Sequence, residues 1–347
     1  MNIDILTTEQ LEQLNQLIDA AQHIVICCHK SPDGDALGSS LAWWSYLTEQ
    51  RQKHAVVVVP DAYPDFLQWL PNSEKIVRFD RKPELATQLF QEAYLVCCLD
   101  FNGTARLNEM EPLLLQSKAN RVLIDHHMQP DIEAQLIISQ PQLSSTSEII
   151  FRLIWQMGHF EQVNKHVAVP IYCGMMTDTM AFTVNSNTPE IYFIISQLLT
   201  KHIDKEKIYR NVYNNYSQWA IRMRGYIMYQ RMNYLQDLHA AFFSVTREDM
   251  LRFHFIKGDA EGLVNEPLRI KGTKLSISLR EDDRKDNLVW VSLRSVGNFS
   301  CQQVAEQFFN GGGHFNASGG RLNCSIEEAE QITRKAIEHY AEQLKQP

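Results

Sequence analysis

The chain has 347 residues, and its 33 lysines and arginines against 41 aspartates and glutamates give a formal net charge of −8. This length favours two domains, and a hydrophobic content of 44% is enough to fill a core in each of them. The acidic balance excludes proteins that hold long duplex DNA on a broad basic surface. An anionic ligand would therefore need metal ions or a few placed arginines.

The beginning of the sequence predicts an amphipathic helix rather than a targeting signal. A capping box runs from Thr7 to Gln10, and the basic and apolar segments of a signal peptide are absent. The most apolar later run, IYFIISQLL, has about half of the roughly 20 residues that cross a bilayer. The seven cysteines fit no disulfide or zinc spacing. We therefore expect a cytoplasmic protein with reduced thiols and no membrane association.

The first half of the chain alternates continuous apolar runs with helical patterns. The runs cover residues 23–29, 55–60, 93–100 and 121–127. Runs this continuous are typical of buried parallel strands that are joined by helical crossovers. We predict an α/β domain over residues 1–200, with a parallel sheet flanked by helices.

The pattern changes in the second half. From about 187 to 237 it is helical, whereas AAFFSV, KLSISLRE and NLVWVSLRS show the period of two that strands have. A final helix is predicted in SIEEAEQITRKAIEHYAEQL. We expect a helical linker over residues 201–237 and a smaller α/β domain over residues 238–347.

Acidic and imidazole side chains follow three of the predicted strands. The carboxyl ends of parallel strands meet at one edge of a sheet, where open α/β sheets bind their ligands. Asp178, beside a further apolar segment, is predicted to contribute to the same edge. The candidates are His29, Asp33, Asp35, Asp100, Asp125, His126, His127 and Asp178.

This mixture of side chains suits Mn²⁺, Fe²⁺, Co²⁺ or Zn²⁺. Two such ions about 3.5 to 4 Å apart would clamp a phosphoryl group and lower the pKa of a bridging water. Gly34 would let the backbone bend so that Asp33 and Asp35 face different ions, and a helix that starts near Ala36 would direct its amides at an anion. Each motif alone also fits a solvent-exposed turn, so the metal site is inferred from their combination.

The C-terminal half contributes a glycine-rich segment and two arginines. The segment NGGGHFNASGG contains Gly311, Gly312, Gly313 and His314, and glycines allow a backbone to approach a phosphate or a base closely. The same residues would also fit a hairpin turn. Arg280 and Arg294 leave the apolar face of their predicted strands, where they would suit phosphate or simply face solvent.

In this order the motifs resemble the DHH phosphoesterase family with a DHHA1-like C-terminal domain. The triplet Asp125-His126-His127 names the family, HKSPDGDALGS resembles its first motif, LDFNGTAR its second and MTDT its fourth. FNGGGHFNASGG resembles the DHHA1 motif. One departure follows Asp178-Thr179, where relatives commonly have a glycine but Met180 and Ala181 precede Phe182 here. We expect this departure to change the packing near the metal edge.

The resemblance implies a role for each matching residue. His29, Asp33 and Asp100 would hold one metal ion, and Asp35, Asp100, His126 and Asp178 the other, with Asp100 as the bridge. His127 would contact the substrate phosphate, and Asp125 would orient the histidines rather than bind metal. The substrate contacts would come from Arg106, Arg280, Arg294, Gly311, Gly312, Gly313 and His314.

The resemblance also implies a function. The compact two-domain type is similar to oligoribonuclease/pAp phosphatases, which use two divalent ions in a cleft between domains. Mn²⁺ is the expected ion, with Mg²⁺ and Co²⁺ as alternatives. The expected partners are short RNA or small nucleotides and not long duplex DNA, and formation of a homodimer stays open. The alternatives are a phosphodiesterase for pApA or cyclic diadenylate and a nucleotide-binding regulatory module without activity.

Overall fold

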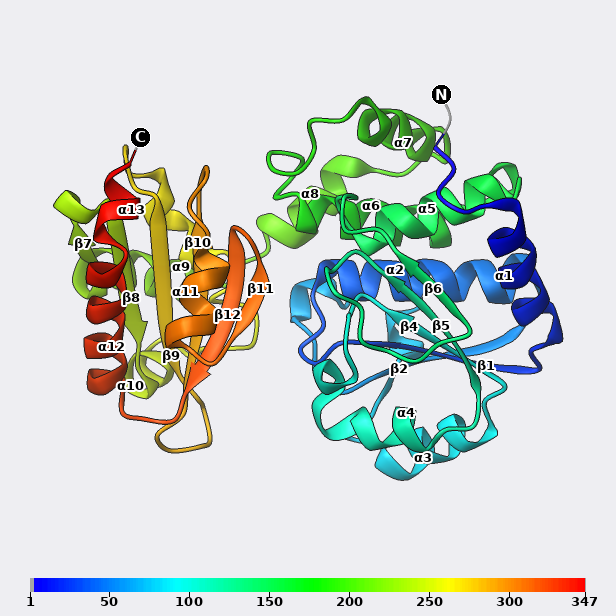
Figure 1. The fold of residues 1–347 in the computed structure, drawn as a ribbon, viewed down its shortest axis with the longest axis horizontal. Helices are drawn as coiled ribbons and strands as arrows, with labels where there is room; N and C mark the ends of the chain where they lie inside the picture. Colours follow the sequence, from blue (N-terminus) through cyan, green and yellow to red (C-terminus); the bar gives the residue numbers. More distant parts are fainter. Residues whose placement is uncertain (1–2, 347) are drawn as a thin grey trace. The chain divides into compact units, whose positions relative to one another are not determined.

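The computed structural model describes residues 3–346 and divides the chain into two compact units (Figure 1). The first unit comprises residues 1–215 and the second residues 216–347, so the division falls within the predicted linker segment. Within the described residues, no helix combines the length and the apolar content that crossing a bilayer requires.

The first unit contains a six-stranded sheet with the order β3-β2-β1-β4-β5-β6, and all neighbouring strands are parallel. The strands are β1 (His23–Cys28), β2 (His54–Val59), β3 (Val77–Arg78), β4 (Leu95–Leu99), β5 (Asn120–Asp125) and β6 (Leu136–Ser139). The four predicted strands are confirmed. The sequence pattern did not reveal β3 and β6, because these two edge strands are only two and four residues long.

Helices cover both faces of this sheet (Figure 1). One face packs against α1 (Thr8–Ala20), α2 (Gly34–Ser45), α5 (Thr146–Gln156) and α6 (Lys165–Asp178), and the other against α3 (Pro83–Glu92) and α4 (Glu111–Gln116). Along β1, Ile24 and Ile26 enter the first core while Val25 and Cys27 enter the second. The helices α7 (Pro189–Thr200) and α8 (Lys205–Tyr213) complete the unit. The prediction of a parallel α/β domain flanked by helices is confirmed.

All seven cysteines are free thiols, as predicted. Six of them are buried, and Cys324 is partly exposed. Cys27 of β1 lies opposite Cys98 of β4 in the sheet. Contact with Cys98, together with burial, raises the pKa of the Cys27 thiol well above its usual range. These thiols therefore pack as small apolar side chains.

The second unit contains a mixed sheet with the order β11-β12-β10-β9-β8-β7. Its strands are β7 (Asn233–Leu235), β8 (Ala240–Val245), β9 (Leu275–Glu281), β10 (Val289–Ser295), β11 (Gly312–His314) and β12 (Ala317–Leu322). Its helices are α9 (Gln218–Tyr226), α10 (Arg247–Arg252), α11 (Cys301–Phe308), α12 (Ile326–His339) and α13 (Ala341–Lys345). The smaller α/β domain is therefore confirmed, and its first strand, β7, lies within the segment predicted as linker.

The alternation predicted for AAFFSV is wrong. All six residues of β8 are buried, and the strand runs parallel to β9. Phe242 packs in the core that includes α11 and α12, whereas Phe243 packs with α9 and α10. Because cores cover both of its faces, β8 has no solvent side that would require polar residues. In β10 the alternation is present, with Val289, Val291 and Leu293 buried.

The helices α2 and α6 of the first unit pack at backbone distance. A Cβ atom added at Gly38 would lie 2.6 Å from the carbonyl oxygen of Pro170 and 2.9 Å from the Cα atom of Gly174. Backbone atoms cannot turn away as a flexible side chain can, so only glycine fits at this position. This contact brings the end of α6 beside the start of α2.

We predict that Gly38→Ala lowers the free energy of unfolding by about 1–3 kcal/mol or more, because the added methyl group overpacks the contact between two helix backbones. Denaturant or thermal unfolding measures the effect. Gly103→Ala is the matched control, since Gly103 is extended and a Cβ atom there would meet nothing within 4 Å. Equal stability of the two variants would contradict the role assigned to Gly38.

Candidate metal centre

The predicted site lies where the strand order of the first sheet reverses. β1 stands between β2 and β4, so the connections from β1 and β4 leave in opposite directions at their carboxyl ends. His29 directly follows β1, Asp100 directly follows β4, and Asp125 ends β5. Open α/β sheets bind ligands at such a switch point. The fold thus brings these side chains together, as the strand-end argument predicts.

Asp100 lies at the centre of the cluster, within 4.0 Å of His29, His126 and His127. Its Oδ2 atom is 3.5 Å from Nε2 of His29, and its Oδ1 atom is 3.6 Å from Nε2 of His126. His29, Asp33 and Asp100 form one group with the separations of metal ligands, and Asp35, Asp100 and His126 form another. The two groups share Asp100, whose side chain is almost fully buried.

Hydrogen bonds at Nδ1 orient the histidines. Nδ1 of His29 lies 2.8 Å from the carbonyl oxygen of Lys30, and Nδ1 of His127 lies 2.7 Å from a carboxylate oxygen of Asp125. These acceptors require a proton on Nδ1, so Nε2 is the atom that each ring presents to a ligand. Such outer contacts are the usual means of fixing metal-binding histidines. Asp125 is fully buried, which suits an orienting role.

Residues at the start of α5 donate hydrogen bonds to Asp35 and Asp100. The backbone amides of Thr146 and Ser147 donate to the Asp35 carboxylate at 2.7 and 2.8 Å, and the Thr146 hydroxyl donates to Asp100 at 2.9 Å. A helix N-terminus stabilises a buried carboxylate in this way. The contacts of Thr146 and Ser147 were not predicted, because their residue types indicate only the beginning of a helix.

Asp178 reaches the predicted edge from a helix, and the expected role of Gly34 is wrong. Asp178 follows no strand but is the last residue of α6, and its Oδ2 atom lies 3.4 Å from Nε2 of His126. Gly34 begins α2, and a Cβ atom there would lie 2.3 Å from the hydroxyl of Thr177. Glycine is therefore needed for the close approach of α6 rather than for a bend between Asp33 and Asp35. The predicted helix near Ala36 does form, and Asp33 caps it.

The charges of the cluster perturb one another. Burial disfavours the charged form of His29, but its contacts with Asp100 and Asp33 outweigh burial and raise its pKa to about 10. Burial is likewise outweighed at His126, where nearby carboxylates, that of Asp178 first, raise the pKa to about 9. Burial, together with the charges of Asp100 and Asp178, raises the pKa of Asp35 well above its usual range. The carboxylates of the cluster therefore favour bound positive charge, which protons or metal cations can supply.

The donor set fits divalent metal ions. Four carboxylates, those of Asp33, Asp35, Asp100 and Asp178, surround the two histidines, and two divalent cations would balance their charge. Mixed imidazole and carboxylate ligands suit first-row transition ions. Asp33, whose side chain is half exposed, would leave one side of the site accessible.

The residues after Asp178 form a left-handed turn. Met180, Ala181 and Phe182 have φ values of 48°, 58° and 62°. Side chains cost about 1–2 kcal/mol per residue in this conformation, so a glycine would be less strained in this turn. The turn is held by a hydrogen bond from the Ala181 amide to the Met176 carbonyl at 2.7 Å. The Phe182 ring packs on Tyr172 at 5.4 Å.

The residues predicted to contact the substrate are divided between the two units of the chain. Arg106 belongs to the first unit, where its side chain is exposed and its carbonyl accepts a hydrogen bond from the Lys30 amide at 2.8 Å. Arg280, Arg294, Gly311, Gly312, Gly313 and His314 belong to the second unit. There, Arg280 and Arg294 leave the apolar face of β9 and β10, as predicted.

The glycine-rich segment forms a hairpin of β11 and β12. A Cβ atom at Gly311 would lie 1.9 Å from the carbonyl oxygen of Gly319, and one at Gly313 would lie 2.7 Å from that of Ala317. These two glycines allow the close approach of the chain to itself, and the contact of all three glycines with a ligand stays a prediction. A Cβ atom at Gly312 would meet only open space, so this position can still face one.

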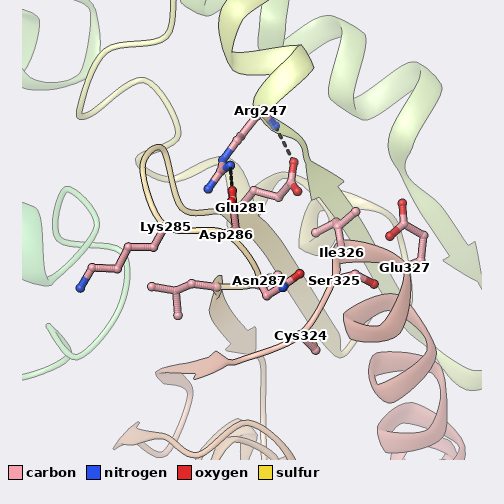
Figure 2. A pocket seen from close by; sticks show the side chains of 11 residues that line it. Arg247, Glu281, Lys285, Asp286, Asn287, Cys324, Ser325, Ile326 and Glu327 are labelled. Carbon is pink, nitrogen blue, oxygen red and sulfur yellow. Dashed lines mark hydrogen bonds and ion pairs between the residues drawn. The ribbon is translucent and has the colours of Figure 1, made fainter.

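A cavity of about 210 Å³ lies elsewhere in the second unit, between residues 285–289 and the start of α12 (Figure 2). Arg247 donates to Glu281 and Asp286 at its wall. None of the predicted site residues lines this cavity. Arg247 and Asp286 form an ion pair there, whereas the groups with metal-ligand separations around Asp100 lie in the first unit.

The fold and the site define an α/β protein whose sheet edge can hold divalent metal ions around a shared aspartate. The chain belongs to the DHH family. The family model described as the DHH family, N-terminal domain, matches residues 23–175, and the DHHA1 domain matches residues 243–343.

The chain is similar to proteins that carry different functional descriptions. The cyclic-di-AMP phosphodiesterase PdeA of Listeria monocytogenes is 25% identical over 95% of the chain, which spans 49% of that protein. The bifunctional oligoribonuclease and PAP phosphatase NrnA of Bacillus subtilis is 24% identical over 92% of the chain and 95% of NrnA. The crystal structure of an exopolyphosphatase-related protein from Bacteroides fragilis is 46% identical, with a TM-score of 0.94 and full coverage of both chains.

We predict that Asp100→Asn removes most of the thermal stabilisation that Mn²⁺ gives to the wild-type protein, because the shared carboxylate is lost. Asparagine should preserve the fold, since it tolerates the left-handed backbone of Asp100, where φ is 64°. The measurement compares unfolding temperatures with Mn²⁺ and with EDTA. Asp80→Asn, at an exposed carboxylate paired with Arg78, is the control and should respond to Mn²⁺ like wild type. A full Mn²⁺ response of Asp100→Asn would rule out a shared ligand.

Proposed function

We propose that this chain is a two-metal phosphohydrolase that degrades short oligoribonucleotides to mononucleotides and dephosphorylates 3',5'-bisphosphoadenosine to AMP. The observation that carries the proposal is that two clusters of imidazole and carboxylate side chains, each with the separations of metal ligands, share Asp100. The similarity to NrnA, which extends over nearly the full length of both chains, supports this substrate class. The net charge of −8 agrees, because a substrate of a few nucleotides needs few basic contacts.

The ligand roles follow the two groups. His29, Asp33 and Asp100 would hold one ion, and Asp35, Asp100, His126 and Asp178 would hold the other. We propose Mn²⁺ rather than Mg²⁺, because Mg²⁺ prefers oxygen ligands and each group contains an imidazole, while Co²⁺ would also fit. When bound, the ions would polarise the phosphoryl group and supply a hydroxide nucleophile near neutral pH.

His127 is proposed to contact the substrate phosphate. Its Nδ1 proton is held by Asp125 at 2.7 Å, so the ring orientation is fixed before substrate arrives. With Nδ1 engaged by Asp125, a proton on Nε2 would let the ring donate to a charged phosphate oxygen at one fixed position. Arg106, with its exposed guanidinium, is proposed to neutralise a further phosphate charge.

The second unit is proposed to bind the nucleotide. Arg280, Arg294 and His314 extend from the same face of its sheet, because their positions are related by cross-strand pairing through Trp290, Ser276 and Ala317. Gly312 adds a backbone position that no side chain covers. Guanidinium groups on a sheet face suit phosphate oxygens, and the open space beside the Cα atom of Gly312 suits close approach of a sugar or base.

The similarity to PdeA favours a second candidate function, hydrolysis of cyclic diadenylate or pApA. The same metal ligands would serve it, so the substrate pocket alone would distinguish the two activities.

A substrate panel tests the proposal. We expect purified protein with Mn²⁺ to release mononucleotides from 5'-labelled RNA of two or three nucleotides and to convert pAp to AMP, with lower kcat/KM for cyclic diadenylate. Asp100→Asn should lower kcat by roughly 10²–10⁴-fold, because charge stabilisation by metal is worth several kcal/mol. The control Asp80→Asn should keep full activity.

The other outcomes of the panel identify the alternatives. A higher kcat/KM for cyclic diadenylate or pApA than for short RNA would replace the main proposal with the second candidate. Calorimetric binding of nucleotides without turnover under Mn²⁺, Mg²⁺ and Co²⁺ would indicate a regulatory module instead of an enzyme.

A further inference from the structure

Thr146 joins the two groups of candidate metal ligands that share Asp100. Its backbone amide donates to Oδ2 of Asp35 at 2.7 Å, and its hydroxyl donates to Oδ1 of Asp100 at 2.9 Å. All three residues are almost fully buried, so solvent water competes little for these hydrogen bonds. One residue therefore contacts both the carboxylate that the two groups share and a carboxylate that belongs to only one of them.

The hydroxyl of Thr146 selects one of the two carboxylate oxygens of Asp100. Oδ1, which accepts from Thr146, lies 3.6 Å from Nε2 of His126, whereas Oδ2 lies 3.5 Å from Nε2 of His29. Each oxygen thus faces a different group of ligands. A carboxylate oxygen has about two acceptor positions, and the hydroxyl takes one of those at Oδ1. One position remains at Oδ1 for a metal ion.

Contacts at the start of α5 hold Thr146 in place. Ser145 caps the helix, and its hydroxyl oxygen accepts from the amide of Glu148 at 3.0 Å. The Glu148 carboxylate accepts from the amide and the hydroxyl of Ser144 at 2.9 and 2.6 Å, and from Arg152 at 2.9 and 2.6 Å. Branching at Cβ also restricts the side chain of a threonine. Protein contacts alone therefore fix where the Thr146 hydroxyl points.

The orientation of the Asp100 carboxylate depends on such a contact. The terminal torsion of an aspartate is broad, so the rotamer itself does not fix the positions of the two oxygens. A turn about this torsion would move Oδ1 away from His126 and Oδ2 away from His29 at the same time. Because a bridging carboxylate needs both oxygens in place, the hydroxyl that holds Oδ1 also sets the position of Oδ2.

We propose that Thr146 is a positioning residue that assigns the two oxygens of Asp100 to different metal ions. Oδ1 would bind the ion beside His126, and Oδ2 the ion beside His29. This inference rests on the proposed function and deepens it. The ion beside His126 depends most on the hydroxyl, because Oδ1 is the oxygen that the hydroxyl holds.

Binding of Mn²⁺ alone to Thr146→Val and Thr146→Ser tests the assignment. Valine keeps the shape and the backbone amide of Thr146 but lacks the hydroxyl, whereas serine keeps the hydroxyl. We expect the wild-type protein to bind two Mn²⁺ per chain, with the electron paramagnetic resonance spectrum of an exchange-coupled pair. Thr146→Val should bind the second ion about 10- to 100-fold more weakly and lose the coupled spectrum, and Thr146→Ser should restore most of the affinity.

Three results of this measurement would overturn the assignment. These are a wild-type protein that binds a single Mn²⁺, an unchanged second affinity in Thr146→Val, and a loss in Thr146→Ser equal to that in Thr146→Val. The last result would mean that the methyl group and not the hydroxyl is required.

Thr333→Val controls for the loss of a buried threonine hydroxyl. Thr333 in α12 of the second unit is fully buried, and its hydroxyl donates to the Ala329 carbonyl at 2.8 Å. This variant should bind Mn²⁺ like wild type. Thr146→Val should unfold at a lower temperature than wild type, with a larger difference in Mn²⁺ than in EDTA. An equal difference in both would show a role in the fold alone and reject the assignment.

Turnover separates this inference from the proposed function. At a Mn²⁺ concentration that just saturates the wild-type protein, Thr146→Val should lower kcat for a 5'-labelled dinucleotide RNA by about 10- to 100-fold. KM should stay near the wild-type value, because Thr146 holds an ion ligand and not the substrate. Weaker Mn²⁺ binding by Thr146→Val in a protein without turnover would uphold the inference and reject the hydrolase. Full kcat in Thr146→Val would reject the inference and leave the hydrolase intact.

Discussion

The concentration of negative charge around Asp100 is the constraint on which the first unit depends. Asp35, Asp100 and Asp125 have at most 2% of their surface exposed, so each needs protein groups in place of water. Asp35 receives two amides from the start of α5, Asp100 receives the Thr146 hydroxyl, and Asp125 receives the His127 ring. The helix α5, the glycine contact between α2 and α6 and the histidine orientations are therefore parts of one arrangement that keeps carboxylates together without water. Such an arrangement is costly for a protein without cations, and it is consistent with a metal centre.

The sequence predicts much of this arrangement because buried parallel strands have a recognisable sequence pattern. A strand that is buried on both faces appears as a continuous apolar run, and the polar residue that follows it must lie at the sheet edge. His29, Asp100 and Asp125 were therefore placed correctly from their neighbours alone. The family resemblance added the order of the motifs, and the matches over residues 23–175 and 243–343 confirm it.

The remaining features depend on contacts between distant segments, which local patterns do not contain. Asp178 reaches the site from the end of a helix, because glycines at the start of α2 let α6 approach. Thr146 contacts Asp100 across 46 residues of sequence, although its letters indicate only a helix start. In the second unit, Gly311 and Gly313 serve the packing of a hairpin, and only the three-dimensional register separates them from Gly312.

The distribution of thiols has a practical consequence for labelling. Six cysteines are enclosed in cores, and Cys324, just before α12, is the partly exposed one. A maleimide dye would thus attach to the native chain chiefly at one position, without prior removal of the other cysteines. Burial and the charge of Glu328 raise the pKa of the Cys324 thiol, so coupling would proceed faster in mildly alkaline buffer. A single dye at Cys324, which lies between β12 and α12, would therefore report on the second unit alone.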